Sequence, residues 1–106
     1  MTSEIGIIKT AKFGLGGGDN ALFGLFLEFE TETWEAQYNA TTQAPGRNTF
    51  LTEQEMFTEL TDICRFLSKN LRDAGIKYVH ELEGKSVNIH YTERTIQSWE
   101  YVKKIM

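Results

Sequence analysis

The chain has few of the residues that cross-link a fold or hold a metal. Its 106 residues include one cysteine, Cys64, one proline, Pro45, and two histidines, His80 and His90. A single thiol excludes an internal disulfide and a site built from several thiolates, and it is typical of a protein that works in a reducing cytoplasm. Two histidines in separate segments are too few nitrogen ligands for a zinc site. We therefore expect no metal and no cofactor.

The chain also lacks a surplus of basic residues and a long apolar run. The 15 Asp and Glu outnumber the 11 Lys and Arg, and the formal net charge is −4. Nucleic-acid binding needs clustered positive charge that displaces counterions, so a nucleic-acid partner is not expected. No apolar run approaches the roughly 18 residues of a membrane span, and the first residues lack the pattern of a signal peptide. These absences favour a cytoplasmic protein without a membrane partner.

The residues that are present describe an ordinary globular domain. Apolar residues make up 41% and aromatic residues 12% of the sequence, and a chain of this length buries a sufficient core without cross-links. No internal repeat or domain boundary divides it. The sequence therefore predicts a single domain over residues 1–106.

Alternating apolar residues predict strands in the first third of the chain, over residues 4–13 and 21–31. The residues predicted to share one face are Ile5, Ile7, Ala11 and Phe13 in the first strand, and Phe23, Leu25, Leu27 and Phe29 in the second. A third, shorter strand is predicted over residues 34–38. A polar loop that contains Pro45 follows it over residues 39–50.

The best-specified element is a helix over residues 53–74. Thr52 and Glu55 have the spacing of a capping box, and Gly75 is placed to end the helix in a left-handed turn with Ile76 packing back on it. Apolar side chains at helical spacing are Met56, Leu60, Ile63, Cys64, Leu67 and Leu71. We therefore expect Cys64 to be a buried core residue.

The last third of the chain predicts a short helical turn at residues 78–82 and a strand over residues 87–91. Residues 95–105 fit both periods, with Ile96 and Val102 on one side and Trp99 and Tyr101 on the other; a strand is favoured and a terminal helix is the alternative. The expected order is β-β-β-α-β-β. It predicts an α+β domain in which one main helix packs on one face of an antiparallel sheet of about five strands.

A glycine run follows the first predicted strand. The series Gly16-x-Gly18-x-x-Ala21 matches the dinucleotide-binding pattern, but that pattern needs a helix N-terminus aimed at the pyrophosphate, and a strand follows here. We interpret the run as the tip of a β-hairpin, where glycine and asparagine adopt positive φ at little cost. The candidate contact residues of this tip are Gly16, Gly17, Gly18, Asp19 and Asn20. Binding of a small ligand or nucleotide by the loop Gly14–Asn20 is the alternative.

Two further groups of residues are candidates for binding. Glu28 and Glu30 share a strand face near Glu32 and Glu35, and they either bind a cation or form a solvated sheet face, which is the commoner case. One helix covers only one face of a sheet, so strand aromatics form either an exposed partner surface or part of the core. The candidate partner-surface residues are Phe26, Trp34, Tyr38, Trp99 and Tyr101.

Four motifs follow one another along the chain. They read Ile8-Lys9-x-Ala11-Lys12-Phe13-Gly14-Leu15-Gly16-Gly17 with Asp19-x-Ala21-Leu22-Phe23-Gly24-Leu25, then Leu71-x-Asp73-Ala74, then Val79-x-x-Leu82-x-Gly84-Lys85-x-Val87, and last Gln97-Ser98-Trp99. The series resembles a family of small proteins encoded by tailed bacteriophages and prophages. Residues 33–38 depart from the glycine-rich, aromatic stretch of that family. The resemblance implies a phage origin and an accessory role in the host cytoplasm, and it brings no established activity.

The missing catalytic constellation and the strand aromatics predict a non-enzymatic protein that binds a host or phage protein. The resemblance adds an expected target, because small acidic phage proteins often inhibit bacterial defence systems such as CRISPR. A homodimer through an exposed edge strand is also expected. Besides a small-ligand or nucleotide binder, the alternative is an accessory protein of phage DNA replication or recombination. In that case Lys9 and Lys12 would share a surface with Lys103 and Lys104.

Overall fold

The predicted α+β fold and its order of elements are confirmed in a computed structural model, which describes residues 2–44, 52–93 and 95–102. The strands are β1 (Thr2–Gly16), β2 (Leu22–Glu30), β3 (Glu35–Gln43), β4 (Ser86–Thr92) and β5 (Thr95–Tyr101); the main helix is α1 (Glu53–Ala74), and two 3-10 turns are η1 (Gly18–Asn20) and η2 (Val79–Leu82). No helix among the described residues is both long and apolar enough to cross a membrane.

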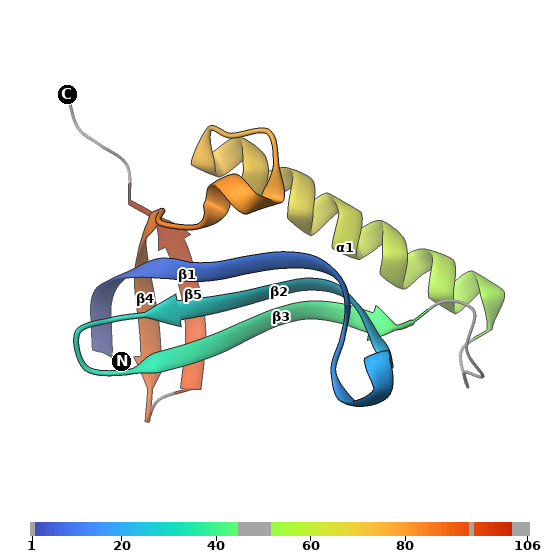
Figure 1. The fold of residues 1–106 in the computed structure, drawn as a ribbon, viewed down its shortest axis with the longest axis horizontal. Helices are drawn as coiled ribbons and strands as arrows, with labels where there is room; N and C mark the ends of the chain where they lie inside the picture. The colour runs from blue at the N-terminus through green and yellow to red at the C-terminus, as the bar shows by residue number, and fades with distance from the viewer. Residues whose placement is uncertain (1, 45–51, 94, 103–106) are drawn as a thin grey trace.

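The sheet is antiparallel throughout and has the strand order β3-β2-β1-β4-β5. Its central strand, β1, divides its length between two neighbours: Thr2–Ile7 pair with β4, and Ile7–Gly16 pair with β2. The sheet therefore curls, and Figure 1 shows β4 and β5 crossing steeply behind one end of β1, β2 and β3. We call its concave side, which α1 and η2 cover, the inner face, and the opposite side the outer face.

A β-bulge in β1 overturns part of the predicted strand pattern. The pairing with β2 shifts between Ile8 and Thr10, so that Lys9 is an extra residue. Because a bulge reverses the alternation, Ile8 and Ala11 both point to the inner face and are buried. Ile5 and Ile7, which the sequence placed with Ala11, instead lie on the outer face and are 57% and 39% exposed.

A second bulge explains the mixed period of the last strand. The pairing of β4 with β5 shifts between His90 and Tyr91, and Gln97 is the extra residue. Ile96 consequently packs against the core together with Trp99 and Tyr101, although the sequence placed it on the opposite side. Residues 95–101 form the favoured strand and not the alternative helix.

The helix α1 begins and ends where its local signals place it. The hydroxyl of Thr52 accepts the N–H of Glu55 at 3.1 Å, and the Glu55 carboxylate accepts the N–H of Thr52 at 3.2 Å. At the other end Gly75 has φ 70°, and the N–H of Ile76 donates to the carbonyl of Leu71 at 3.0 Å. The capping box and the left-handed end are therefore confirmed.

The core lies between the inner face of the sheet and one side of α1. Its buried apolar residues are Ile8, Ala11, Leu25, Leu27, Phe29, Ala44, Ile63, Leu82, Val87 and Ile89. Ile63 is buried, whereas its neighbour Cys64 lies on the solvent side of the helix, so the prediction of a core Cys64 is wrong. The polar loop predicted from residue 39 is also wrong up to residue 43, because β3 continues there opposite β2. The rest of that loop, with Pro45, lies outside the described residues.

Candidate functional site

A cleft of about 740 Å³ opens between α1 and the edge strand β5. Three elements supply its walls: β3 gives Tyr38, the second half of α1 gives one side, and β5 gives the other. The lining residues are Tyr38, Phe66, Lys69, Asn70, Asp73, Gln97, Ser98, Trp99, Glu100 and Tyr101. The cleft therefore combines aromatic side chains on its core side with polar and charged side chains around its mouth.

The aromatic side chains of the cleft form one packed cluster centred on Trp99. Its ring centroid lies 5.0 Å from that of Phe29, 5.8 Å from that of Tyr38 and 5.3 Å from that of Tyr101, each in an edge-on arrangement. Tyr38 in turn lies 6.0 Å from Phe66 of α1. Edge-on contacts at these distances are favourable beyond the area they bury. The cluster thus fixes the wall of the cleft and connects β3 with β5, the two outermost strands of the sheet.

A buried amide holds the helix side of the cleft. Asn70 is 4% exposed, and its Nδ2 donates to the carbonyl of Phe66 at 2.8 Å while its Oδ1 accepts the hydroxyl of Tyr101 at 2.7 Å. Burial raises the pKa of Tyr101 well above its usual value, and the charge of Asp73 raises it further. Tyr101 therefore stays protonated and keeps its proton on Asn70. These groups position one another and offer no acid or base at neutral pH.

The mouth of the cleft carries an exposed ion pair. Lys69 and Asp73, one turn apart on α1, are in contact at 2.5 Å, and their side chains are 74% and 45% exposed. Exposed pairs of this kind contribute little to stability. They do give the mouth one charge of each sign that a binding partner can meet.

The five candidate partner-surface residues do not form one surface. Tyr38, Trp99 and Tyr101 meet in the cleft. Trp34 lines an adjoining hollow of about 590 Å³ between β3 and the start of β5, which shares Tyr38 with the cleft. Phe26 lies on the outer face, where its ring covers Gly16: a Cβ on that glycine would come within 2.6 Å of the ring. All five are partly buried, so core packing and surface exposure are combined in each.

The helix residues of the cleft were not singled out from the sequence, although a signal for them exists. Phe66 and Asn70 are four residues apart and fall on the same helical stripe as the buried Ile63. A polar residue inside an apolar stripe indicates a buried amide that needs hydrogen-bond partners. The sequence contains that signal, but it does not identify Tyr101 as the partner.

A second polar centre closes the opposite end of the curled sheet. The Glu4 carboxylate, on the inner face of β1, accepts hydrogen bonds from Tyr91 Oη at 3.0 Å, Thr33 Oγ1 at 3.0 Å and Trp34 Nε1 at 3.1 Å. The rings of Trp34 and Tyr91 lie 4.8 Å apart beside it. Partial desolvation raises the pKa of Glu4, but the hydrogen bonds from Tyr91, Thr33 and Trp34 together lower it more, and the net pKa lies below 4.5. A carboxylate with so many donors is a structural tie and not a proton donor.

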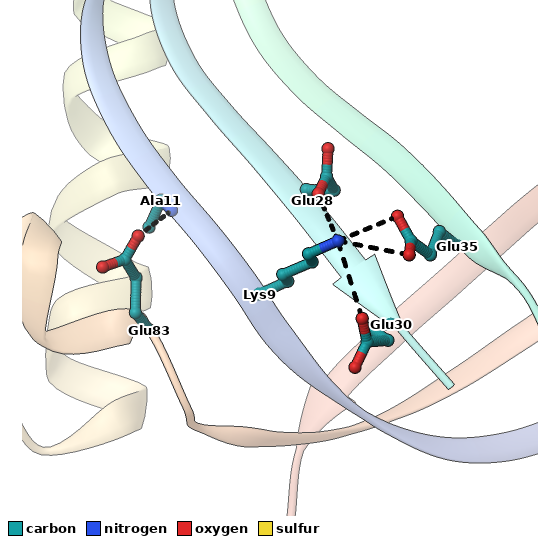
Figure 2. Close-up of polar contacts among 6 residues, drawn as sticks. All are labelled: Lys9, Ala11, Glu28, Glu30, Glu35 and Glu83. Atoms are coloured by element: carbon teal, nitrogen blue, oxygen red, sulfur yellow. Dashed lines mark hydrogen bonds and ion pairs between the residues drawn. The ribbon is translucent and has the colours of Figure 1, made fainter. Parts of the chain in front are cut away.

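The acidic side chains of β2 and β3 lie around a cation of the chain itself, the ammonium group of Lys9 (Figure 2). The bulge directs Lys9 across the outer face, where its Nζ lies 3.7 Å from Glu28, 3.7 Å from Glu30 and 3.2 Å from Glu35. The hydrogen bond and charge of Glu35 raise the pKa of Lys9; desolvation opposes part of this rise, and the charges of Glu28 and Glu30 add to it. The ammonium group therefore stands where a bound cation was considered. Lys9 is therefore engaged within the chain, and the predicted partners of its basic surface, Lys103 and Lys104, lie outside the described residues.

The glycine run forms the tip of the β1–β2 hairpin, as the sequence predicted. The last paired residues are Gly16 and Leu22, and Asp19 and Asn20 have φ of 55° and 53° in the turn between them. The following residues enter β2 and not a helix. One glycine of the flanking strand is required by close approach, because a Cβ on Gly24 would lie 2.2 Å from the carbonyl oxygen of Ala40. The run therefore forms the tip of the hairpin, and the element that follows it is the strand β2.

The remaining nucleophiles and histidines are dispersed. On the outer face Ser3 Oγ lies 2.7 Å from His90 Nδ1, and His90 Nε2 lies 2.9 Å from Glu100. This Ser-His-Glu row runs across the three adjacent strands β1, β4 and β5 as a cross-strand polar ladder, and only its Glu100 also lines the cleft. His80 stacks on Tyr78 in η2, and Cys64 lies on α1. Among the described residues no group of three or more His, Cys, Asp or Glu is arranged to hold a metal ion.

No family model, curated protein or solved structure matches this chain.

Proposed function

We propose that this chain is a non-enzymatic protein-binding domain and that the cleft between α1 and β5 is its docking surface. The observation that supports the proposal is the composition of the cleft. Tryptophan and tyrosine side chains that are half-buried and held by packing lie inside a polar rim that includes Lys69 and Asp73. Rigid aromatic anchors surrounded by polar groups are the common arrangement of energetically important interface sites.

The groups in the cleft favour binding over a reaction. Tyr101 keeps its proton on Asn70, and Lys69 is paired with Asp73. Covalent catalysis needs a nucleophile within hydrogen-bond reach of a base, and the side chains that line the cleft do not supply such a pair. A partner that inserts an apolar side chain against Trp99 would gain contact area without any rearrangement of these hydrogen bonds.

The biological setting of the proposal rests on the sequence resemblance alone. We place the protein in the host cytoplasm as a phage accessory protein whose partner is a host or phage protein. An inhibitor of a bacterial defence system such as CRISPR is the case we favour, because small acidic phage proteins often have that role.

An affinity capture from nuclease-treated bacterial lysate tests the proposal when it compares three forms of the protein. The cleft variant carries Lys69→Glu and Ser98→Arg, two exposed lining positions. The matched control carries Lys77→Glu and Thr92→Arg, which make the same changes in charge at exposed positions outside the cleft. We expect the wild type and the control to retain the same stoichiometric partner, and the cleft variant to bind it at least about tenfold more weakly.

The circular dichroism and unfolding midpoint of all three forms show whether each is folded. Equal capture by a folded cleft variant would contradict the proposed docking surface. If no partner is captured by any form, from the lysate or from phage-infected cells, the protein-binding function itself is contradicted.

A further inference from the structure

The structure leaves one long edge of the central strand unpaired. Strand β4 pairs with β1 only from Thr2 to Ile7. Just beyond, the Glu83 carboxylate takes the place of a neighbouring strand by accepting the N–H of Ala11 at 3.2 Å (Figure 2). No other strand of the described chain lies beside residues 12–16 on that side. The distal part of β1 therefore has β2 on one side and an open edge on the other.

Main-chain groups of Phe13 and Leu15 face this open edge. The N–H of Ala11 points away from β2, and alternate residues of a strand direct their main-chain groups to the same side. Phe13 and Leu15 thus present a ladder of donors and acceptors outward. Their side chains are 38% and 60% exposed. An unpaired edge with apolar side chains is a template for another strand.

We propose that the occupant of this edge is a second copy of the chain, which adds its own residues 12–16 in an antiparallel, two-fold symmetric pairing. The register that fits sets Gly14 opposite Gly14 of the other copy and Phe13 opposite its Leu15. Both outward-facing residues then exchange N–H and carbonyl groups with their counterparts. The two apolar side chains pack as cross-strand pairs. Ala11 keeps its bond to Glu83, because it lies beyond this ladder.

The glycine run leaves enough room for the two strands to pair in this register. Ala11 would lie opposite Gly17 of the other copy, so that copy's hairpin tip enters the hollow of about 870 Å³ between β1 and the side chains of Tyr78 and His80. A Cβ on Gly18 would meet nothing within 4 Å in its own chain. That glycine is therefore not required by packing within one copy, whereas the absence of side chains at residues 16–18 suits a narrow contact.

On the outer face, the same pairing brings a lysine of one copy next to an aromatic ring of the other. Lys12 would lie opposite Gly16 of the other copy, whose outer side is covered by the ring of Phe26. An ammonium group above an aromatic face is attracted to it. The two-fold axis forms this contact twice and keeps the two Lys12 side chains apart. A single strand from each copy buries less than the roughly 800 Å² per partner of a standard interface, so the dimer is a weak one.

Sedimentation velocity of the wild-type protein from about 10 µM to about 1 mM, a range suited to weak affinities, tests the proposal. We expect a concentration-dependent dimer, together with slower hydrogen exchange of the Phe13 and Leu15 amides at high concentration. The variant Leu15→Pro removes an outward donor without breaking a bond to β2. We expect it to weaken the dimer at least about tenfold, because an edge that has lost a ladder hydrogen bond pairs poorly.

Gln37→Pro is the matched control, because Gln37 is an exposed residue of the edge strand β3 and its N–H also faces away from β2. It should dimerise as the wild type does. Leu15→Lys, at a mostly exposed side chain, provides a second disruption if the proline variant does not fold. A wild type that stays monomeric throughout, or folded Leu15 variants that dimerise normally, would overturn the proposal. The result is independent of the cleft, because the cleft and the β1 edge share no residue.

Discussion

At the scale of single residues, one charged side chain on the inner face, Glu4, joins three segments of the chain. The Glu4 carboxylate joins β1 to Tyr91 of β4 and to Thr33 and Trp34 of the turn between β2 and β3. It therefore closes the curl of the sheet at the end remote from the hairpin tip. A charge-assisted hydrogen bond is stronger than a neutral one, so the acceptor's charge matters as well as its position.

The substitution Glu4→Gln should destabilise the protein at pH 7 and do so much less at pH 3. The pKa of Glu4 is lowered below 4.5 in the folded state. A lowered pKa stabilises the fold above the unfolded-state pKa, and the contribution is lost as the pH falls through the folded-state pKa. Urea unfolding at both pH values measures the difference in unfolding free energy between wild type and variant. Glu32→Gln, which makes the same change at an exposed position in the same turn, is the control and should cost less stability at pH 7.

At the scale of the elements, the bulge in β1 decides where a charged side chain lies on the outer face. Its bulge turns Lys9 onto the outer face, where one ammonium group lies among the carboxylates of Glu28, Glu30 and Glu35. Without that cation, three negative side chains would lie next to one another on two paired strands. Like charges on neighbouring strands are destabilising.

The substitution Lys9→Met should therefore lower the unfolding free energy modestly at low salt, because ion pairs between partly exposed groups contribute little individually. Added salt should reduce the loss, because it screens the repulsion that remains among the carboxylates. Chemical unfolding at low protein concentration, with and without salt, measures both effects. Lys12→Met makes the same change further along the outer face and should cost less. An equal loss in both variants, unaffected by salt, would show that the acidic cluster does not need its cation.

The elements differ in how well the sequence predicts them, and the reason is the range of the interactions. The helix α1 was predicted to the residue because Thr52, Glu55 and Gly75 act on backbone groups within one turn of themselves. The hairpin tip was predicted for the same reason. The bulges at Lys9 and Gln97 depend on pairing between strands, and no local pattern marks them; each reversed the expected side of its neighbours.

The residues of the candidate site also differ in whether local sequence or long-range contacts decide their positions. The sequence singles out the aromatic residues of the strands, but which residues of β3 and β5 meet depends on the curl of the sheet. The curl brings Tyr38 and Trp99 together, whereas Phe26 lies on the outer face because side chains alternate along β2. Cys64 was placed in the core because its helical spacing fits the apolar stripe, whereas the burial of Ile63 and Asn70 sets the stripe about one position to the other side.

At the scale of the whole molecule, the aromatic cluster holds the two ends of the sheet together. Strands β3 and β5 are the first and last of the sheet order, yet Tyr38 of one and Trp99 of the other lie 5.8 Å apart. No main-chain ladder joins these strands. The side-chain contact, shared with Phe29 and α1, is therefore what keeps the curled sheet closed around the cleft.

A double-mutant cycle measures the coupling energy between Tyr38 and Trp99. We expect Trp99→Leu and Tyr38→Leu to lower the unfolding free energy individually, and the two losses to be coupled by about 0.5–1.5 kcal/mol, the range of edge-on aromatic pairs. Urea unfolding of the wild type, both single variants and the double variant gives the coupling energy. The control cycle pairs Tyr38→Leu with Trp34→Leu, because the Trp34 ring contacts Tyr91. That cycle should be close to additive. Additive losses for Tyr38 and Trp99 as well would mean that their contact does not hold the sheet closed, and that α1 alone sets the width of the cleft.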